Sequence, residues 1–158
     1  MPVDVQRQPA LAGIPEDAEL VRFAEAALDD PADAAICVRI VDEAEGRALN
    51  HRWRGKDSAT NVLAFPAAAP PGLPADSVPS IMGDVVLCAP VAAREAAEQH
   101  KTSAHHWAHL IVHGILHLRG FDHIHGHEAA EMESAERRIL AALGVPDPYA
   151  DDASSGAA

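Results

Sequence analysis

Histidines with the spacing of metal ligands stand in the segment HLIVHGILHLRGFDH, residues 109–123. Residues four apart on an α-helix lie one turn above each other, so His113 and His117 are expected to project from one face. Gly120 allows the backbone to reverse after the helix, and His123 can then return as a third ligand. Three neutral imidazoles leave one coordination position open, as in catalytic zinc sites. We therefore predict one bound Zn²⁺, although three histidines also suit other divalent first-row metals.

The same spacing occurs in the metzincin protease pattern HExxHxxGxxH, with one difference. That pattern has a glutamate directly after the first histidine as the general base, and this chain has Gly114 there. Without the carboxylate a peptidase loses its proton acceptor, so the spacing predicts metal-dependent hydrolysis of some other bond. One turn before the first ligand, His109 is expected to line the groove or to support a ligand. Asp122 can orient a ligand imidazole, act as a base or stabilise the turn.

Positive charge is scarce in this chain and concentrated in one segment. Lys and Arg number 12 against 24 Asp and Glu, which gives a formal net charge of −12. A uniformly acidic surface repels nucleic acid. A third of the basic residues nevertheless falls within ten positions, at Arg47, Arg52, Arg54 and Lys56. Contact with phosphate must therefore be local, and we expect it at this segment, although Arg54 can equally form a surface salt bridge.

The composition fits one globular domain. The chain has 158 residues, of which 48% are hydrophobic, enough for a core of ordinary size. No apolar run approaches the length of a membrane span, and residues 1–15 lack the pattern of a signal peptide. Cys37 and Cys88 lie in apolar runs and are expected to be buried, reduced thiols. We therefore expect a cytoplasmic protein that does not associate with membranes.

Apolar periodicity and β-branched runs predict strands interspersed with helices. The expected strands are residues 3–6, 35–42, 60–65 and 80–88, and the expected helices are residues 15–28, 43–53, 90–100, 102–118 and 127–143. The Ala- and Pro-rich stretch Ala67–Pro79 predicts an irregular loop, and residues 150–158 predict a disordered C-terminal tail. Residues 1–149 are thus expected to form a single α+β domain.

In the histidine segment and in three further stretches, the chain resembles the YbeY family of bacterial rRNA maturation factors and endoribonucleases. The matching stretches are LNHRWRGKDSATNVLAFP (Leu49 to Pro66), GDVVLC (Gly83 to Cys88), HWAHLIVHGILHLRGFDH (His106 to His123) and EAAEMESAERRILAALG (Glu128 to Gly144). Together they span most of residues 49 to 149 in the family's order. The resemblance implies a small, mostly parallel sheet of about four strands packed with helices around a central metal-binding helix, a zincin-like arrangement.

The resemblance also implies an activity and its residues. The family's motif histidines bind zinc and fall here on His113, His117 and His123, while the arginine of RGKD, here Arg54, lies in the active-site groove. The implied function is a zinc-dependent, single-strand-specific endoribonuclease, with Arg54 and His113 as catalytic residues. It would mature rRNA, notably the 3′ end of the small-subunit rRNA, and act in ribosome quality control. The implied partners are single-stranded RNA, the small ribosomal subunit with its ribosomal proteins, and an Era-type GTPase.

The residues and the resemblance suggest one mechanism and leave two alternatives. Zinc would activate a water or the RNA 2′-hydroxyl, and zinc and Arg54 would together stabilise charge in the transition state. The first alternative is a ribosome assembly factor whose zinc is not catalytic. The second is a metallopeptidase-like hydrolase, against which Gly114 counts.

Overall fold

The computed structural model of the chain describes residues 3–8, 11, 13–67, 71–121 and 126–148. Four strands, β1 (Val3–Arg7), β2 (Ala34–Val41), β3 (Val62–Pro66) and β4 (Ile81–Cys88), form one sheet in the order β1-β2-β4-β3. The pairs β1–β2 and β2–β4 are parallel, whereas β3 pairs antiparallel with β4. The predicted α+β domain with a four-stranded sheet is confirmed. The sheet is mixed: two of its three strand pairs are parallel, and the third is antiparallel because β3 returns directly into β4 without a crossover helix.

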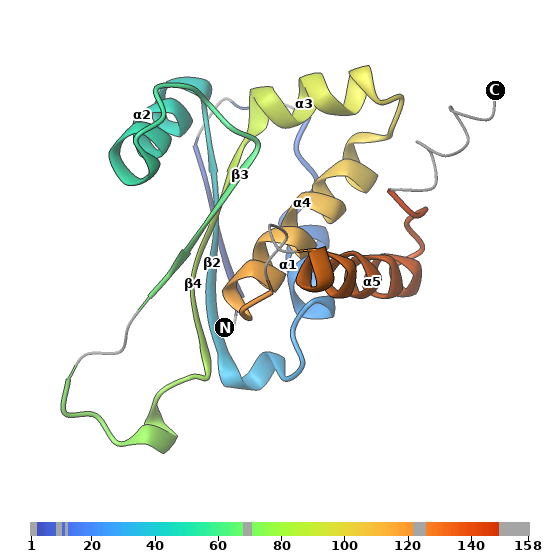
Figure 1. The fold of residues 1–158 in the computed structure, drawn as a ribbon. Coiled ribbons are helices and arrows are strands. Elements are labelled where there is room, and N and C mark those ends of the chain that lie inside the picture. The colour runs from blue at the N-terminus through green and yellow to red at the C-terminus, as the bar shows by residue number, and fades with distance from the viewer. Residues whose placement is uncertain (1–2, 9–10, 12, 68–70, 122–125, 149–158) are drawn as a thin grey trace.

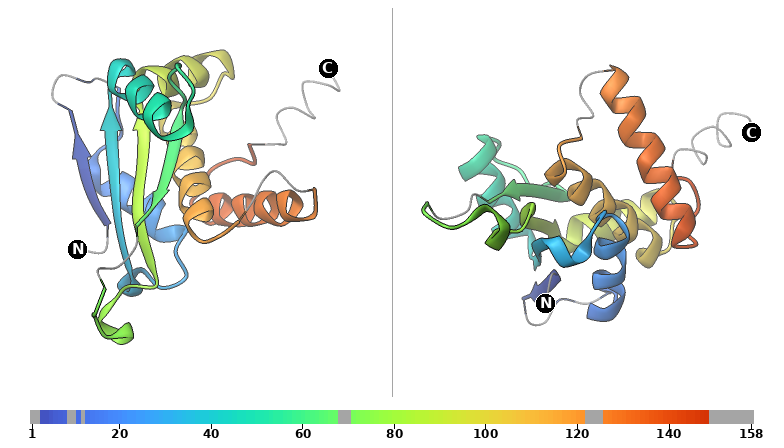
Figure 2. Two further views of the ribbon diagram at one scale, coloured as in Figure 1. Left: turned by 60° about the vertical axis from the view of Figure 1, so that its left-hand side comes forward. Right: turned by 90° about the horizontal axis from the view of Figure 1, so that it is seen from below.

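Helices cover the two faces of the sheet unequally. The five helices are α1 (Asp17–Ala26), α2 (Glu43–Arg54), α3 (Ala89–Glu98), α4 (Ser103–Leu118) and α5 (Gly126–Ala142). Helices α1 and α4 lie on one face and α2 lies on the other, while α5 packs against α4 on the side away from the sheet (Figures 1 and 2). The histidine-bearing helix α4 is thereby central, as the resemblance implies. No helix in the described ranges is long and apolar enough to cross a membrane.

The observed elements begin and end within two residues of those predicted. Two 3₁₀ turns were not anticipated: Pro31–Asp33, and Ala75–Ser77 inside the predicted loop. Gly120 adopts φ 98° directly after α4, so its predicted role in ending the helix is confirmed. The predicted tail at 150–158 lies outside the described residues.

Close contact between α4 and the sheet fixes the position of the histidines. The side chains of Trp107, Ile111 and Ile115 are at most 1% exposed, so this face of α4 is core. At Gly114 the helix approaches the sheet so closely that a Cβ atom would lie 2.8 Å from a methyl group of Val85. The residues of α4 on either side of Gly114 are therefore held at a fixed distance from β3 and β4.

Candidate metal centre and groove

A groove of about 640 Å³ runs between α4, β3 and the loop that follows α2. Its lining combines histidines of α4 with apolar groups of β3 and one guanidinium. The lining residues are Arg54, Thr60, Asn61, Val62, Ala64, Pro66, His109, Leu110, His113, Gly114, His117, Leu118 and Phe121. The two segments singled out from the sequence thus meet in one groove, although they are some fifty residues apart in the chain.

Two imidazoles converge at the floor of the groove. The side chain of Thr102 caps α4 by accepting a hydrogen bond of 3.1 Å from the backbone N–H of His105, and the helix then runs unbroken through His113 and His117. The Nε2 atoms of His113 and His117 lie 3.2 Å apart. Two nitrogens bound to one tetrahedral zinc are separated by about 3.3 Å, so the pair fits a shared ion. The third predicted ligand, His123, lies outside the described residues.

The other ring nitrogen of His113 faces a buried carboxylate. Glu136 of α5 is 1% exposed; its Oε2 lies 2.7 Å from His109 Nε2 and its Oε1 lies 3.2 Å from His113 Nδ1. Burial alone would raise the pKa of Glu136, but the hydrogen bonds from the two histidines and their charge outweigh it and hold that pKa at about 2. Glu136 is therefore an anion that accepts from both rings.

His113 thus belongs to two groups of possible ligands. His109, His113 and Glu136 could together hold a metal ion, because one ligand atom from each lies within 4.8 Å of the others. His113 and His117 offer a second arrangement through their Nε2 atoms. Both arrangements use His113, whose Nδ1 lies beside Glu136 and whose Nε2 lies beside His117.

Arg54 lies across the groove from these histidines. It is the last residue of α2, a helix that Asp42 caps by accepting a hydrogen bond of 2.8 Å from the backbone N–H of Glu45. Gly55 then ends α2 with φ 72°, a left-handed conformation that suits glycine. The Arg54 side chain is exposed and lines the groove. Its positive charge can therefore attract a phosphate there.

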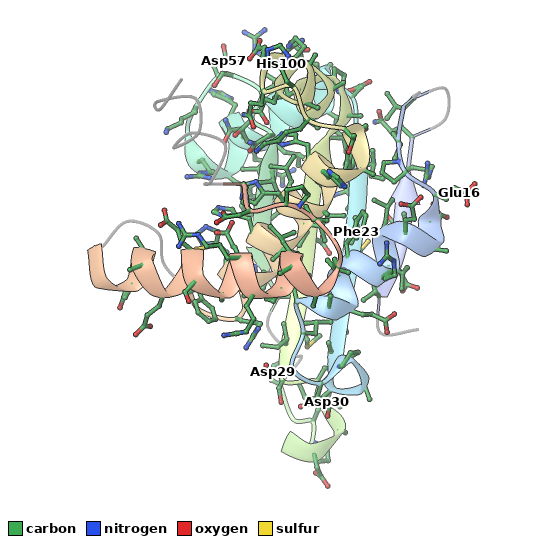
Figure 3. The ribbon with its side chains drawn as sticks, turned by 90° about the vertical axis from the view of Figure 1, so that its right-hand side faces the viewer. Glu16, Phe23, Asp29, Asp30, Asp57 and His100 are labelled. Atoms are coloured by element: carbon green, nitrogen blue, oxygen red, sulfur yellow. The ribbon has the colours of Figure 1, made fainter. Side chains whose placement is uncertain are left out.

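The other basic residues of the segment are not equivalent to Arg54. Arg47 donates two hydrogen bonds to Asp57, of 2.7 and 2.8 Å. This pairing lowers the pKa of Asp57 and raises that of Arg47. Figure 3 places Asp57 at the same end of the molecule as His100, which precedes α4. Of the four basic residues in this segment, Arg47 thus pairs with a carboxylate, and the expectation of phosphate contact at residues 47–56 stays a prediction.

Comparison with known proteins assigns the family. The family model described as "Endoribonuclease YbeY" matches residues 16–144. The chain belongs to the YbeY family. A YbeY endoribonuclease of Pseudomonas putida KT2440 is 56% identical over 151 residues, which cover 95% of this chain and 94% of that protein. One from Halorhodospira halophila is 64% identical over 114 residues, which cover 72% of this chain and 73% of the relative.

A solved structure supports the fold independently. The solution structure of TM1509 from Thermotoga maritima matches with a TM-score of 0.51 at 22% identity, covering 89% of this chain and 91% of that one. At this level of identity the likeness concerns the fold alone.

The YbeY motif TNVLAFP is held beside the groove by a network of hydrogen bonds. This network was not predicted from the sequence. Asn61 donates from Nδ2 to Glu95 of α3 at 3.0 Å, and its Oδ1 accepts a hydrogen bond of 2.6 Å from the backbone N–H of Val62. Glu95 also lies 2.9 Å from His106 Nε2, and His106 is 2% exposed. Burial lowers the pKa of His106, while Glu95 opposes this shift. Asn61 thus fixes the start of β3 beside α3.

Glu136 is the other important residue that sequence reasoning missed. Met132, Ala135, Ile139 and Leu140 form the buried face of α5, and Glu136 lies among them at 1% exposure. A glutamate on the apolar face of an amphipathic helix is the signal that could have identified it.

Proposed function

We propose that this chain is a zinc-dependent endoribonuclease specific for single-stranded RNA. Membership of the endoribonuclease YbeY family supports a hydrolase that acts on RNA. The observation that carries the metal assignment is the convergence of His113 and His117, with Nε2 atoms 3.2 Å apart, on a groove that Arg54 also lines. In this proposal His113, His117 and His123 hold one Zn²⁺, and Arg54 and His113 are the catalytic residues.

The chemistry of RNA cleavage suits this arrangement of side chains. An oxygen from water or the neighbouring 2′-hydroxyl bonds to phosphorus as the P–O bond to the leaving oxygen breaks, and negative charge grows on the non-bridging oxygens. Zinc held by the three histidines would supply a Lewis acid and would lower the pKa of a coordinated water to about 7. Arg54 holds the phosphate in the groove and stabilises the growing negative charge through its guanidinium. The walls of the groove at Val62 and Ala64 are apolar, which strengthens these interactions by excluding water.

Electrostatics favour a local approach of the RNA. The formal net charge of −12 repels a polyanion at long range, so binding depends on the few cations at the groove. Arg54, Arg52 and Lys56 are exposed at the end of α2 and in the residues that follow it. Because only a few cations are available to contact phosphates, we expect a binding constant that falls only moderately as the salt concentration rises.

The peptidase alternative is disfavoured by packing as well as by sequence. A Cβ at position 114 would lie 2.8 Å from Val85 and 3.3 Å from Val62, so the general-base glutamate of the protease pattern has no room there. The helix α4 lying across a mixed sheet is nevertheless the arrangement that we propose to be zincin-like.

We also propose, from the family resemblance, a role in maturing the 3′ end of small-subunit rRNA and in ribosome quality control. The proposed setting is the cytoplasm, with ribosomal proteins and an Era-type GTPase as partners.

Two variants separate the proposed roles. His113→Ala should lose both bound zinc and cleavage of a single-stranded RNA oligonucleotide. Arg54→Ala should keep one zinc per chain and lose cleavage by about 100-fold or more, the scale of removing one group that stabilises transition-state charge. Metal content and cleavage are measured on the same preparations. Full activity of Arg54→Ala would remove this residue from the mechanism, and a zinc-loaded wild-type chain that cleaves no RNA would support the assembly-factor alternative.

A further inference from the structure

Glu136 is a buried carboxylate with two histidine partners, and its burial is unfavourable to the stability of a small domain. Glu136 is 1% exposed and is one of three buried polar or charged residues in the described part of the chain, with Asn50 and His106. Taking a carboxylate out of water is unfavourable unless hydrogen bonds and opposite charge compensate for it. An apolar residue at this position of α5 would pack against α4 without that cost. The presence of glutamate therefore calls for a role that an apolar side chain could not fill.

The contacts of Glu136 determine where His113 carries its proton. A carboxylate oxygen accepts a hydrogen bond from an imidazole N–H, so the contact of 3.2 Å between Glu136 Oε1 and His113 Nδ1 favours the tautomer with its proton on Nδ1. In a neutral imidazole the lone pair then lies on Nε2. This is the nitrogen that lies 3.2 Å from His117 Nε2. The second carboxylate oxygen accepts from His109 at 2.7 Å, which prevents the carboxylate from rotating.

We propose that Glu136 is a positioning residue that fixes His113 in the tautomer and orientation that present Nε2 to the metal, so that α5 belongs to the metal centre without supplying a ligand. The proposal rests on the proposed function for its metal. Its own content is that α5, the helix that follows the histidine motif, sets the affinity of the site. Groups that hydrogen-bond to metal ligands in this way typically change metal affinity by about 10- to 100-fold when removed.

Direct ligation by Glu136 is the competing arrangement. In that case the ion would be held by one ligand atom each from His109, His113 and Glu136, which lie within 4.8 Å of one another. Glu136 does not line the groove, whereas His113 and His117 do. A catalytic ion needs an open position toward its substrate, and an ion between His113 and His117 would border the groove that both residues line. The groove therefore favours positioning over ligation.

The test measures the affinity of purified protein for Zn²⁺ and Co²⁺ by competition with a chelator, together with the d–d absorption of bound Co²⁺. Glu136→Gln preserves size but can accept from one ring only, so we expect roughly 10-fold weaker binding, and up to about 100-fold for Glu136→Ala. The control is Glu131→Gln, the same change at an exposed position of α5, with affinity unchanged. In Glu136→Gln the Co²⁺ band should keep its position and intensity at saturation, because the ligands are the same.

Two further variants distinguish positioning from ligation. His109→Gln should retain one ion per chain, and His117→Ala should lose it. Loss of the ion in His109→Gln and Glu136→Gln with retention in His117→Ala would overturn the proposal in favour of the buried ligand set. Unchanged affinity in both Glu136 variants would overturn it as well. Failure of the wild-type chain to cleave RNA would refute the proposed function but leave these metal affinities, and hence the role of Glu136, as they were.

Discussion

Replacing Gly114 with alanine tests the close approach of α4 to the sheet. In an ordinary helix interior this change stabilises a protein by about 1 kcal/mol, because glycine is a poor helix former. Here the added methyl group would lie 2.8 Å from Val85 Cγ1 and 3.3 Å from Val62 Cγ2. Val85 is fully buried and cannot swing aside. Forcing an extra methyl group into such a core costs about 1–3 kcal/mol, so we expect net destabilisation of about 1 kcal/mol.

Thermal and urea unfolding followed by circular dichroism measure this change. A loss of about 1 kcal/mol should lower Tm by about 2–4 °C in a domain of this size. The matched control is Val85→Ala, which makes room at the contact, combined with Gly114→Ala in a double-mutant cycle. The double variant should be more stable than the sum of the two single effects predicts, by about 0.5 kcal/mol or more. A Gly114→Ala protein about 1 kcal/mol more stable than the wild type, with no coupling to Val85, would refute the reasoning.

Two further predictions concern aromatic and thiol side chains. Trp53, beside Arg54, is 60% exposed, whereas Trp107 is 1% exposed. Titration with a single-stranded RNA oligonucleotide should therefore quench the fluorescence of Trp53 alone. Quenching that persists in Trp53→Phe would place the RNA elsewhere. Burial raises the pKa of both Cys37 and Cys88, so both should react slowly with Ellman's reagent at pH 7. Cys88, at 2% exposure, should react only on unfolding, and rapid labelling in the native state would contradict its burial.

Features that depend on local spacing were predictable from the sequence. His113 and His117 face the same way because a helix repeats every 3.6 residues, and Gly120 ends that helix because glycine tolerates positive φ. The strands followed from β-branched runs, and the placement of Arg54 in the groove with the histidines agrees with the family resemblance. Apart from the placement of Arg54, which came from the family resemblance, none of these inferences required knowledge of which elements pack together.

Features that depend on tertiary pairing were not predictable. Glu136 contacts His109 and His113 only because α5 packs on α4, and in the sequence it is one glutamate among several. The pairing of Arg47 with Asp57 depends on the turn at Gly55, which brings residues ten apart within 2.7 Å. The antiparallel placement of β3 likewise depends on which edge of the sheet it joins. Long-range contacts of this kind leave no periodic signal in the sequence.

The central claim is that a metal ion bound by the histidines of α4 is required to cleave RNA. The most direct measurement is the rate at which the full chain cleaves a single-stranded RNA oligonucleotide. The rate is measured before chelation, after chelation, and after stoichiometric Zn²⁺ is restored. Elemental analysis verifies the residual metal content of the chelated protein. We predict that cleavage is lost on chelation and recovered with one equivalent of Zn²⁺. Undiminished cleavage by protein shown to be free of metal would contradict the account.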